Sequence, residues 1–585
     1  MTILLDERVP RTLDVLLRTW ARPEHRGALL EAWLFEDEAE RRRGEELLAG
    51  VGVEARLRSA YKPLVHAFLE EIDAAALRRA VIVYPLHPGA DPRRFQLEAY
   101  PLAALLEAAE VRFEPGGPDL VYRVVTEDRH GGRKEQSVFA PNRLVANHLG
   151  ATDLAPTGWL TVTRRPDGAP DVDEPLETEI EALFRKAVAA VTAHDWPAEE
   201  PHCERLSLDV TLAGIERPLA YGDEVMSTRE ALHEDLYFTV LEWFKHRAGR
   251  SMEDRRLQPG QIVPDVRAGT GDARVRVSIS PFGAPIDPAR PEQELSRAEH
   301  ALSLAQIHRE VALLPGERFE GRSREGRPIP GLYRPGPRPA VLVTAGQHAN
   351  ETSGVVGALR AAGELLRDPG AHLAVIPVEN PDGYALHGRL CEDNPRHLHH
   401  AARYTALGSD LEYGPDEPPA EKGARLRALA LSGACLHVNL HGYPAHEWTR
   451  PFTGYLPRGF ELWTIPKGFF LIVRHHPAWA EQARELLERV TERVAAVPGL
   501  SDFNRRQIEV CAAHSGGAPY SVVRGIPCLI GPDARSPVPL TLITEFPDET
   551  VLGPAFVFAH AVQAATVLAA EAAFADIMQA SVQAS

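Results

Sequence analysis

The second half of the chain alternates between short apolar runs and longer amphipathic segments. Apolar runs of strand length lie at residues 340–344, 374–378, 436–440, 528–530 and 542–544. Segments with apolar residues at helical spacing lie at residues 295–313, 354–366, 420–431, 479–497 and 556–573. Apolar strands separated by helices are typical of a largely parallel sheet that is covered on both faces. The pattern therefore predicts an α/β fold for residues 295–585, with ligands bound beyond the carboxyl ends of the strands.

The first half has a less regular pattern. Leucines at helical spacing predict a mainly helical segment over residues 11–71. Strands are predicted at residues 80–84, 120–125 and 136–139, and helices at residues 177–194 and 228–247. His130-Gly131-Gly132 predicts a hairpin turn, and Ser227 with Glu230 is a candidate capping box. We therefore expect an α+β region over residues 1–280, with room for two subdomains.

A Pro-rich and charged stretch separates the two halves. Residues 281–292 read P-F-G-A-P-I-D-P-A-R-P-E, a composition that is typical of a linker. We therefore predict three parts: an N-terminal region of unknown role at residues 1–280, a linker at residues 281–294 and a further domain at residues 295–585.

Charge and cysteine content exclude several classes of function. The formal net charge is -18, from 64 Lys and Arg against 82 Asp and Glu, which argues against nucleic-acid binding because that needs a basic surface. The cysteines are few, scattered and odd in number, so we expect no disulfide framework and a cytoplasmic location. We find no export signal and no apolar stretch long enough to span a membrane, so we expect no membrane partner. The oligomeric state stays open.

Four short motifs follow predicted strands and carry the chemistry. They are V-L-V-T-A-G-Q-H-A-N-E at residues 341–351, V-E-N-P-D-G-Y at 378–384, V-N-L-H-G-Y at 438–443 and L-I-T-E-F-P-D-E at 542–549. His348, Glu351 and His441 supply two imidazoles and one carboxylate, a ligand set that leaves zinc a fourth position for water. Glu545 is the candidate general base for that water. A polar helix-capping loop and a surface carboxylate are the alternatives, but strand ends that meet at one edge favour a shared metal site.

Other histidines and one aspartate have less specific patterns. His437 lies within the strand of His441, and we expect it to make a buried hydrogen bond. We expect the clusters His397 to His400 and His475-His476 to be solvated, and we therefore expect a single zinc ion. Asp410 is a candidate partner for the second ring nitrogen of a ligating histidine, with an ordinary loop aspartate as the equal alternative.

The ordered set of motifs resembles that of one enzyme family. The four motifs occur together with E-G-R-P-I at residues 325–329 and S-G-G at residues 515–517. In this set, the region from about Leu295 onward resembles the carboxypeptidase A-type zinc metallopeptidases, the funnelins. The resemblance implies an α/β/α sandwich on a mixed, mostly parallel sheet. It also implies that one zinc ion is bound by His348, Glu351 and His441, that Glu545 is the general base and that Asp410 supports the first zinc histidine.

The sequence departs from the family pattern at the substrate-binding segment. The family's G-x-D-x-N-R appears here as G-S-D-L-E-Y at residues 408–413. The Asn-Arg pair that binds a free C-terminal carboxylate in the family is thus replaced by Glu412 and Tyr413. Because a glutamate repels a carboxylate, we expect Glu412 to face a positively charged or amidated group of the substrate.

Two further family positions are uncertain in the sequence. The family's mobile tyrosine is replaced by Ala512, and His514 and Tyr520 are the candidates to fill its place. The arginine that polarises the scissile carbonyl is assigned to Arg396, with Arg389 and Arg403 as rivals.

We therefore expect a cytoplasmic, zinc-dependent hydrolase that cleaves a peptide or peptide-like amide. One alternative is an N-acyl amino acid deacylase, because the short gap between His348 and His441 resembles the succinylglutamate desuccinylase and aspartoacylase branch. A cell-wall peptide amidase and a non-catalytic zinc-binding scaffold are the others. The presence of a base as well as three ligands argues against the scaffold.

Overall fold

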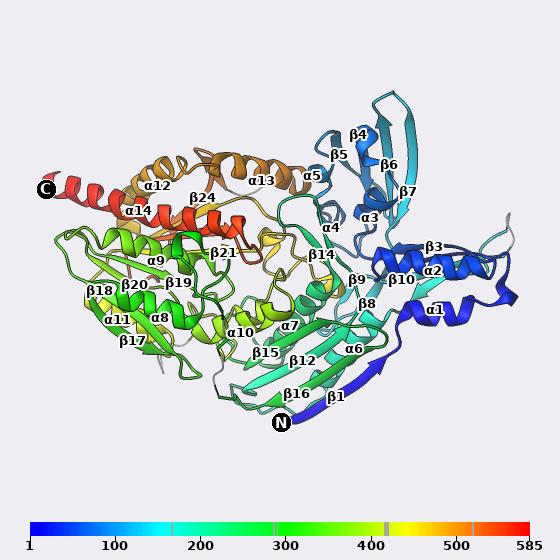
Figure 1. The fold of residues 1–585 in the computed structure, drawn as a ribbon, viewed down its shortest axis with the longest axis horizontal. Helices are drawn as coiled ribbons and strands as arrows, with labels where there is room; N and C mark the ends of the chain where they lie inside the picture. Colours follow the sequence, from blue (N-terminus) through cyan, green and yellow to red (C-terminus); the bar gives the residue numbers. More distant parts are fainter. Residues whose placement is uncertain (165–167, 285–286, 289, 415–419, 518–519, 585) are drawn as a thin grey trace.

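The C-terminal region of the computed structural model is built on one nine-stranded sheet (Figure 1). The structure describes residues 1–585 except 165–167, 285–286, 289, 415–419, 518–519 and 585. The strands are β17 (Glu317–Arg322), β18 (Pro328–Arg334), β19 (Val341–Ala345), β20 (Leu373–Ile376), β21 (Leu436–Tyr443), β22 (Phe470–His475), β23 (Ser521–Val523), β24 (Ile526–Pro532) and β25 (Leu540–Pro547). Their order in the sheet is β17-β18-β20-β19-β21-β25-β22-β24-β23.

The sheet is mixed, with its parallel strands at the centre. Strands β20, β19, β21 and β25 are parallel to their neighbours within this run. The pairings of β18 with β17 and β20, of β22 with β25 and of β23 with β24 are antiparallel. The expected α/β class with a mixed sheet is therefore confirmed.

Helices cover both faces of this sheet because its strands are apolar on both sides. The helices are α8 (Leu304–Leu313), α9 (Ser353–Leu365), α10 (Pro381–Asp393), α11 (Lys422–Ser432), α12 (Ala480–Val494), α13 (Leu500–Ser515) and α14 (Pro554–Ala584). Val341 and Val343 of β19 point into the core beneath α9, α12 and α14, whereas Leu342 points to the opposite core beneath α11. The sequence pattern did not predict α10, β22 or α13, and the single helix expected at 295–313 begins only at Leu304.

The long C-terminal helix α14 corrects one expectation. Its segment Pro554–Ala580 is long and apolar enough to cross a membrane by length and composition, contrary to the sequence analysis. Most of its apolar side chains are buried against α9 and α12 in the core. On its inner face, Gln563 donates a hydrogen bond to the main-chain carbonyl of His441. In this structure α14 is therefore a core helix that supports the end of β21.

The N-terminal region contains several smaller sheets rather than one (Figure 1). One sheet has the order β1-β16-β12-β15, a second β11-β10-β2-β3 and a third β5-β4-β6-β7. Their strands are β1 (Thr2–Val9), β2 (Leu29–Leu34), β3 (Glu54–Ser59), β4 (Leu77–Tyr84), β5 (Glu110–Pro115), β6 (Val121–Asp128), β7 (Arg133–Phe139), β10 (Gly158–Thr163), β11 (Val172–Leu176), β12 (Arg205–Leu212), β15 (Gln261–Ala268) and β16 (Ala273–Ser280). Two pairs, β8 (Asn142–Ala146) with β9 (Thr152–Pro156) and β13 (Glu216–Pro218) with β14 (Val225–Ser227), complete the set.

The helical prediction for residues 11–71 was wrong. The segment forms α1 (Thr12–Trp20), α2 (Glu38–Gly50) and α3 (Pro63–Glu70), separated by the parallel strands β2 and β3. The apolar run L-L-E-A-W-L of β2 fits both the helical and the strand spacing of apolar residues. So short a run cannot be assigned to a helix or a strand by its periodicity alone. The hairpin of β6 and β7 and the helices α6 (Glu179–Thr192) and α7 (Thr228–Arg247) are confirmed.

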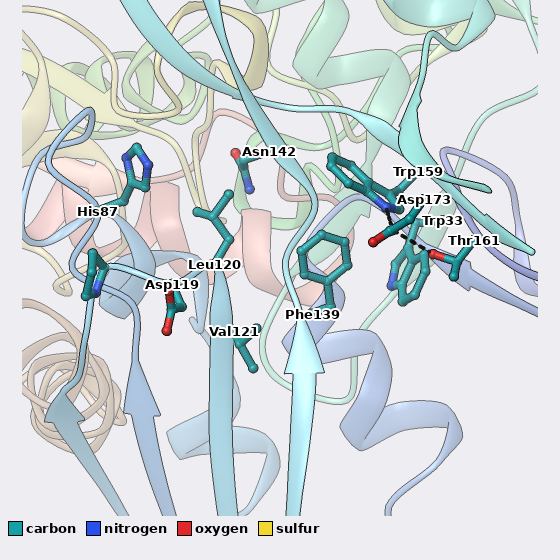
Figure 2. A pocket seen from close by; sticks show the side chains of 11 residues that line it. Trp33, His87, Asp119, Leu120, Val121, Phe139, Asn142, Trp159, Thr161 and Asp173 are labelled. Carbon is teal, nitrogen blue, oxygen red and sulfur yellow. Dashed lines mark hydrogen bonds between the residues drawn. The ribbon is translucent and has the colours of Figure 1, made fainter. Parts of the chain in front are cut away.

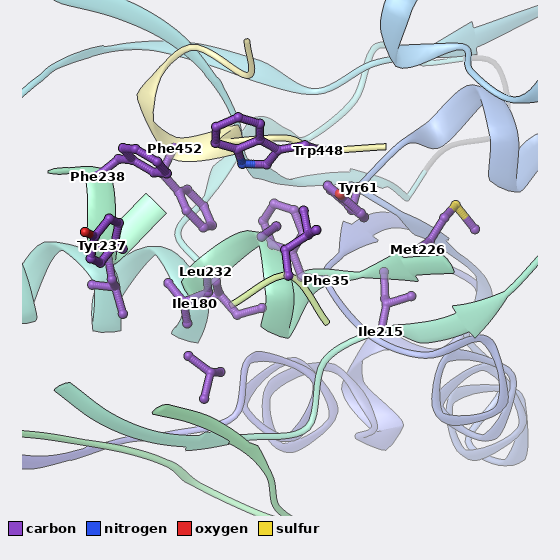
Figure 3. Close-up of a cluster of buried hydrophobic side chains, with 14 of the residues drawn as sticks. Phe35, Tyr61, Ile180, Ile215, Met226, Leu232, Tyr237, Phe238, Trp448 and Phe452 are labelled. Atoms are coloured by element: carbon purple, nitrogen blue, oxygen red, sulfur yellow. The ribbon is translucent and has the colours of Figure 1, made fainter. Parts of the chain in front are cut away.

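Helix α7 joins the two halves of the molecule. The Ser227 hydroxyl accepts a hydrogen bond from the Glu230 amide at the start of the helix. The Glu230 carboxylate does not complete the predicted capping box but lies 2.8 Å from His446 Nε2 of the C-terminal half. Trp448 and Phe452, also of the C-terminal half, pack into the same apolar core as the N-terminal Phe238 (Figure 3). The predicted linker at 281–294 includes residues 285, 286 and 289, which lie outside the described part of the chain.

Candidate metal centre

The carboxyl ends of adjacent strands bring the predicted zinc ligands into contact. His348 and Glu351 lie in the loop between β19 and α9, and His441 lies in the neighbouring strand β21. The Nδ1 atom of His348 lies 2.8 Å from Glu351 Oε1 and 3.1 Å from the Nδ1 atom of His441. The Nδ1 atom of His441 lies 2.8 Å from Glu351 Oε2. Three side chains from two separate motifs thus converge on one point.

The geometry and chemistry of this donor set fit zinc. The three ligand atoms lie within 4.8 Å of one another, and all three residues are buried. In a tetrahedral site with ligands about 2.0–2.1 Å from zinc, neighbouring ligand atoms are about 3.3 Å apart. The observed separations of 2.8 to 3.1 Å are close to that value. Both histidines present Nδ1, which leaves each Nε2 atom available to another partner.

Main-chain packing behind the site fixes the two strand ends. Asp548, in the loop after β25, accepts a hydrogen bond from the amide of Ser353 at the start of α9. The same carboxylate lies against Gly442, where a Cβ atom would meet Asp548 Oδ1 at 1.9 Å. A side chain at position 442 would therefore displace either the strand of His441 or the cap of the helix that follows Glu351.

Asp410 lies where the sequence analysis expected it. Its Oδ2 atom is 3.6 Å from Nε2 of His348, the ring nitrogen that does not face the ligand cluster. Burial alone would raise the pKa of Asp410, but His348 and the neighbouring arginines hold it well below its ordinary value. The Asp410 amide donates a hydrogen bond to the carbonyl of Arg255. The N-terminal half therefore helps to position the aspartate.

Glu545 lies beside His441 on the same side of the sheet. The two residues are direct partners in the parallel register of β21 and β25, and partners in adjacent strands point to the same face. Burial and the nearby Glu351 raise the pKa of Glu545 well above its ordinary value. Burial also acts on Glu351, but His348, His441 and Arg403 outweigh it and lower that pKa. One carboxylate is thus suited to bind a cation and the other to exchange a proton.

The arginine at the centre is Arg403 and not Arg396. Arg396 is half exposed and its Nη1 atom donates to Asp223 at 2.9 Å, and Arg389 donates to Asp265. Arg403 Nη1 donates to Glu351 Oε1 at 2.7 Å. The structure thus places Arg403, one of the two rivals, at the ligand cluster in place of Arg396, because spacing along a loop does not show which arginine turns inward.

The motif N-P-D-G-Y explains how Arg403 is held. Asn380 caps α10 by accepting from the Gly383 amide, and its side-chain nitrogen donates to the Tyr404 carbonyl at 2.9 Å. Asp382 accepts from Arg327 of the E-G-R-P-I motif at 3.0 Å. These two motifs are therefore structural elements that fix the loop next to the ligands.

Glu412 forms an ion pair within the protein. Its carboxylate accepts a hydrogen bond from Arg425 Nη1, and the Glu412 side chain is partly exposed. Arg425 also binds Glu379 through two hydrogen bonds and Gln347 through a third. Tyr413 lies beneath two guanidinium groups, with Arg255 5.4 Å and Arg535 5.7 Å from its ring centre.

The two candidates for the missing tyrosine differ in position. His514 lies away from the ligands at the contact between α13 and the N-terminal half, where its Nε2 atom accepts from the Ala103 amide at 3.2 Å. Its ring also packs on Tyr100 and Phe113. His514 thus belongs to α13 and is engaged by the N-terminal half. Tyr520 is half-buried, and burial raises its pKa to about 12.

The histidines at 397, 399 and 400 are buried, contrary to the expectation that they are solvated, and so is His475, whereas His476 is partly exposed. His397 lies 3.0 Å from a Glu216 oxygen, and His400 pairs with Glu234 of α7. His437 faces the Thr344 hydroxyl at 2.8 Å, as expected for a buried hydrogen-bonding residue.

Three charged residues near the centre were missed by the sequence analysis. Arg425 lies behind Gln347, Glu549 lies 3.6 Å from Arg403, and Lys467 is buried among aromatic rings next to Glu545. The motif T-E-F-P-D-E ends in a second acidic residue, and this residue could have indicated that Glu549 also lies near the site. Lys467 could have been noticed because it is a lone lysine among aromatic residues, in a chain whose basic residues are mostly arginines.

A separate hollow of about 590 Å³ lies in the N-terminal region (Figure 2). Trp33, Phe139 and Trp159 line it, and Asp173 accepts hydrogen bonds from Trp159 and Thr161 there. None of the residues predicted for catalysis or metal binding lines this hollow.

Comparisons with known proteins agree with the motifs. Residues 318–413 match the family model of the zinc carboxypeptidases, and no curated protein matches the sequence. A metallo-carboxypeptidase from Burkholderia cenocepacia is 17% identical, with 54% of this chain and 77% of that chain covered and a TM-score of 0.31. Carboxypeptidase A from Helicoverpa armigera is 14% identical, with 53% and 90% covered and a TM-score of 0.28.

A third similar structure is the murein-tripeptide amidase of Escherichia coli O157. It is 17% identical, with 45% of this chain and 95% of that chain covered and a TM-score of 0.23. Because such TM-scores are low, the assignment rests on the family match and on the motifs within it. The residues that match the zinc carboxypeptidase model, 318–413, include His348, Glu351 and Asp410.

Proposed function

We propose that this chain is a zinc-dependent hydrolase of peptide or peptide-like amide bonds. The observation that carries the proposal is the convergence of His348, Glu351 and His441 on one point, with Glu545 on the strand beside them. Zinc bound there supplies a Lewis acid for the scissile carbonyl and lowers the pKa of a water molecule. The family match of residues 318–413 supports the same reaction.

The protein's own residues then transfer the proton, stabilise the developing negative charge and orient a zinc ligand. Glu545, in its carboxylate form, takes a proton from the attacking water and, once protonated, gives that proton to the leaving amine. Arg403 places positive charge where the carbonyl oxygen becomes negative. Asp410 holds the ring of His348 so that Nδ1 faces the other two ligands.

We also propose that the enzyme acts in the cytoplasm. All five cysteines are free, in keeping with a reducing compartment. Fractionation of cells that express the full chain tests this proposal, and recovery from an extracellular fraction would contradict it.

The proposed function is tested with a mixed substrate pool and mass spectrometry of the products. The pool contains free-ended peptides, C-terminally amidated peptides, N-acyl amino acids and cell-wall peptides. Zinc-loaded protein is expected to cleave at least one class, and Glu545→Gln is expected to abolish that cleavage. The cleaved class separates a carboxypeptidase from a deacylase and from a cell-wall amidase. Zinc binding without any hydrolysis would contradict the proposal and favour a scaffold.

A further inference from the structure

A buried lysine occupies an aromatic cage in the connection between β21 and β22. Lys467 lies just before β22, and its residue is 2% exposed. Its Nζ atom lies 4.5 Å from the ring centre of Tyr443, 5.1 Å from that of Trp463 and 5.6 Å from that of Phe470. Aromatic faces attract a cation, and more strongly when water is excluded. The cage therefore stabilises an ammonium group at this position.

The ammonium group has unused hydrogen-bonding capacity. An ammonium group carries three donors. Within the described part of the chain, Lys467 Nζ makes one hydrogen bond, to the Ile465 carbonyl at 3.4 Å. That distance is near the upper limit for such a bond. Because burying a charge without strong partners costs free energy, the arrangement indicates that a further acceptor approaches from outside the protein.

The register of the sheet places this group next to the proposed reaction centre. Glu545 is paired with His441 on one side and with Phe470 on the other. Directly paired residues share one face of a sheet, so Phe470 lies on the face that carries Glu545. Tyr443, two residues after His441 in β21, points to the same face. The cage of Lys467 thus lies on the same face of the sheet as the proposed active site.

The charge of Lys467 acts on Glu545 and is retained near neutral pH. Lys467 is among the groups that lower the pKa of Glu545 against the effects of burial and Glu351. Burial lowers the pKa of Lys467 to about 8, and Cys511 and Glu545 oppose that shift. The group is therefore mostly protonated at pH 7.

Other cations near the centre are already paired. Arg425 is engaged by Glu379, Gln347 and Glu412. Arg403 contacts Glu351 and Glu549. Of the three cations Arg403, Arg425 and Lys467, only Lys467 has no carboxylate in an ion pair with it in the described part of the chain.

We propose that Lys467 is a specificity-determining residue that receives a carboxylate of the substrate adjacent to the scissile amide. This inference rests on the proposed amide hydrolysis. The carboxylate has two possible sources, the amino acid that leaves or a dicarboxylic acyl group, and both present the same chemistry to the ammonium group.

Matched substrate pairs test the assignment with zinc-loaded protein. One pair is a peptide with a free C-terminus and its amide, and the other is an amino acid acylated by a dicarboxylic or by a monocarboxylic acid. In Lys467→Met, kcat/KM for the carboxylate-bearing member of the preferred pair is expected to fall about 10- to 100-fold, mainly through KM. The neutral member is expected to lose less, because it is subject only to the effect of Lys467 on Glu545. The pair that responds identifies the source of the carboxylate.

Two further variants serve as controls. Lys467→Arg, which keeps the charge, is expected to retain part of the preference for the carboxylate. Lys186→Met removes a lysine whose partner is Glu7 in the N-terminal region and is expected to leave both substrate pairs unchanged. An equal loss on charged and neutral substrates in Lys467→Met would overturn the proposal, because the lysine would then act only on Glu545 or on the fold.

A binding measurement separates this proposal from the proposed function. In zinc-loaded Glu545→Gln, the affinity for each member of the two pairs is measured by calorimetry without turnover. The carboxylate-bearing member is expected to bind more tightly than its neutral partner, and the added Lys467→Met change is expected to remove that difference. Equal affinities with and without Lys467 overturn the inference whether or not the wild type hydrolyses any amide.

Discussion

Two carboxylates in one buried site have pKa values that shift in opposite directions. Glu351 is held in the charged form by two histidines and Arg403, whereas burial and Glu351 itself favour the protonated form of Glu545. The difference follows from position: Glu351 lies between the two imidazoles, and Glu545 lies one strand further along the sheet. The residues of the same type are therefore suited to different roles, one as a ligand and one as a proton carrier.

The first prediction concerns zinc affinity. Asp410→Asn is expected to weaken zinc binding about 10- to 100-fold, because the carboxylate that orients His348 is lost. Glu351→Gln removes a proposed ligand and is expected to weaken zinc binding further. Metal content is measured after dialysis against graded chelator concentrations. Asp533→Asn, at a surface pair with Arg535, is the control, and equal zinc retention in all variants would contradict the assigned ligand set.

The second prediction distinguishes two arginines. Arg403→Gln is expected to lower kcat about 10²- to 10³-fold, the usual effect of losing a group that stabilises a developing oxyanion. Arg396→Gln is expected to remain close to the wild type, because that side chain pairs with Asp223 at the surface. Steady-state kinetics on the substrate found in the pool experiment measure both. A larger effect from Arg396 would reverse the assignment.

The sequence predicted the cluster of His348, Glu351 and His441 but not its surroundings, for a physical reason. His348, His441 and Glu545 follow apolar strands, and parallel strands end at one edge of a sheet, so local pattern alone brings them together. Arg396 and Arg403 lie in one irregular loop, where only tertiary contacts decide which side chain turns inward. Lys467 depends on a cage assembled from several segments, which no local spacing reveals.

At the scale of elements, α7 joins the two halves through buried charges. Glu234 pairs with His400 in the loop that leads to Arg403. Further along the helix, Glu242 binds Arg450 at 2.6 Å and Arg458 at 3.0 Å. These arginines belong to the long connection between β21 and β22, which also carries Lys467. The N-terminal half therefore supports the loops around the metal centre.

The third prediction concerns how much the ion pairs of Glu242 contribute to stability. Glu242→Gln is expected to lower the free energy of unfolding by about 3 kcal/mol, because it leaves buried arginine charge uncompensated. Glu253→Gln, at an exposed position, is the matched control and is expected to change it by less than about 0.5 kcal/mol. Urea denaturation followed by fluorescence gives both values. A Glu242 variant as stable as the control would show that the ion pairs contribute no net stability.

The fourth prediction concerns acid and the contact between α2 and α3. Burial raises the pKa of Glu70, but hydrogen bonds from His66 and Arg41 outweigh it and lower the pKa to about 2. Because the folded-state pKa is lower than the unfolded one, the charged Glu70 stabilises the fold above about pH 4.5 and loses this effect as pH falls toward 2. Glu70→Gln is therefore expected to be destabilising at pH 7 and progressively less so below pH 4.5. A pH-independent difference in unfolding free energy would contradict this.

At the scale of the whole molecule, the fold class was predicted correctly for the C-terminal region, which is built on a single large sheet. The C-terminal sheet has long apolar strands and helices in regular order, so periodicity identified its fold class. The N-terminal region divides its residues among several small sheets with short strands, in which helical and strand periods are hard to separate. The shared core that contains Trp448 and Phe452 depends on long-range packing that local pattern does not contain.

The fifth prediction concerns residues 281–585 expressed alone. Without the N-terminal half, Trp448, Phe452 and the buried arginine Arg450 lose their apolar and ionic partners. The fragment is expected to show no cooperative thermal unfolding transition and to bind zinc weakly. Calorimetry and metal analysis test this. A fragment that unfolds cooperatively and holds zinc would establish residues 281–585 as an independent domain.

The hydrogen bond from α14 to the His441 carbonyl has a consequence for the order of events during synthesis. His348 and His441 leave the ribosome before Glu545, and Glu545 leaves before α14, because translation runs from the N-terminus. Until α14 docks, the end of β21 lacks this support and a long apolar helix is exposed. The same docking event thus withdraws a membrane-like segment from solvent and completes the metal centre. Zinc acquisition is therefore expected to follow the emergence of α14 and to serve as a late marker of correct folding.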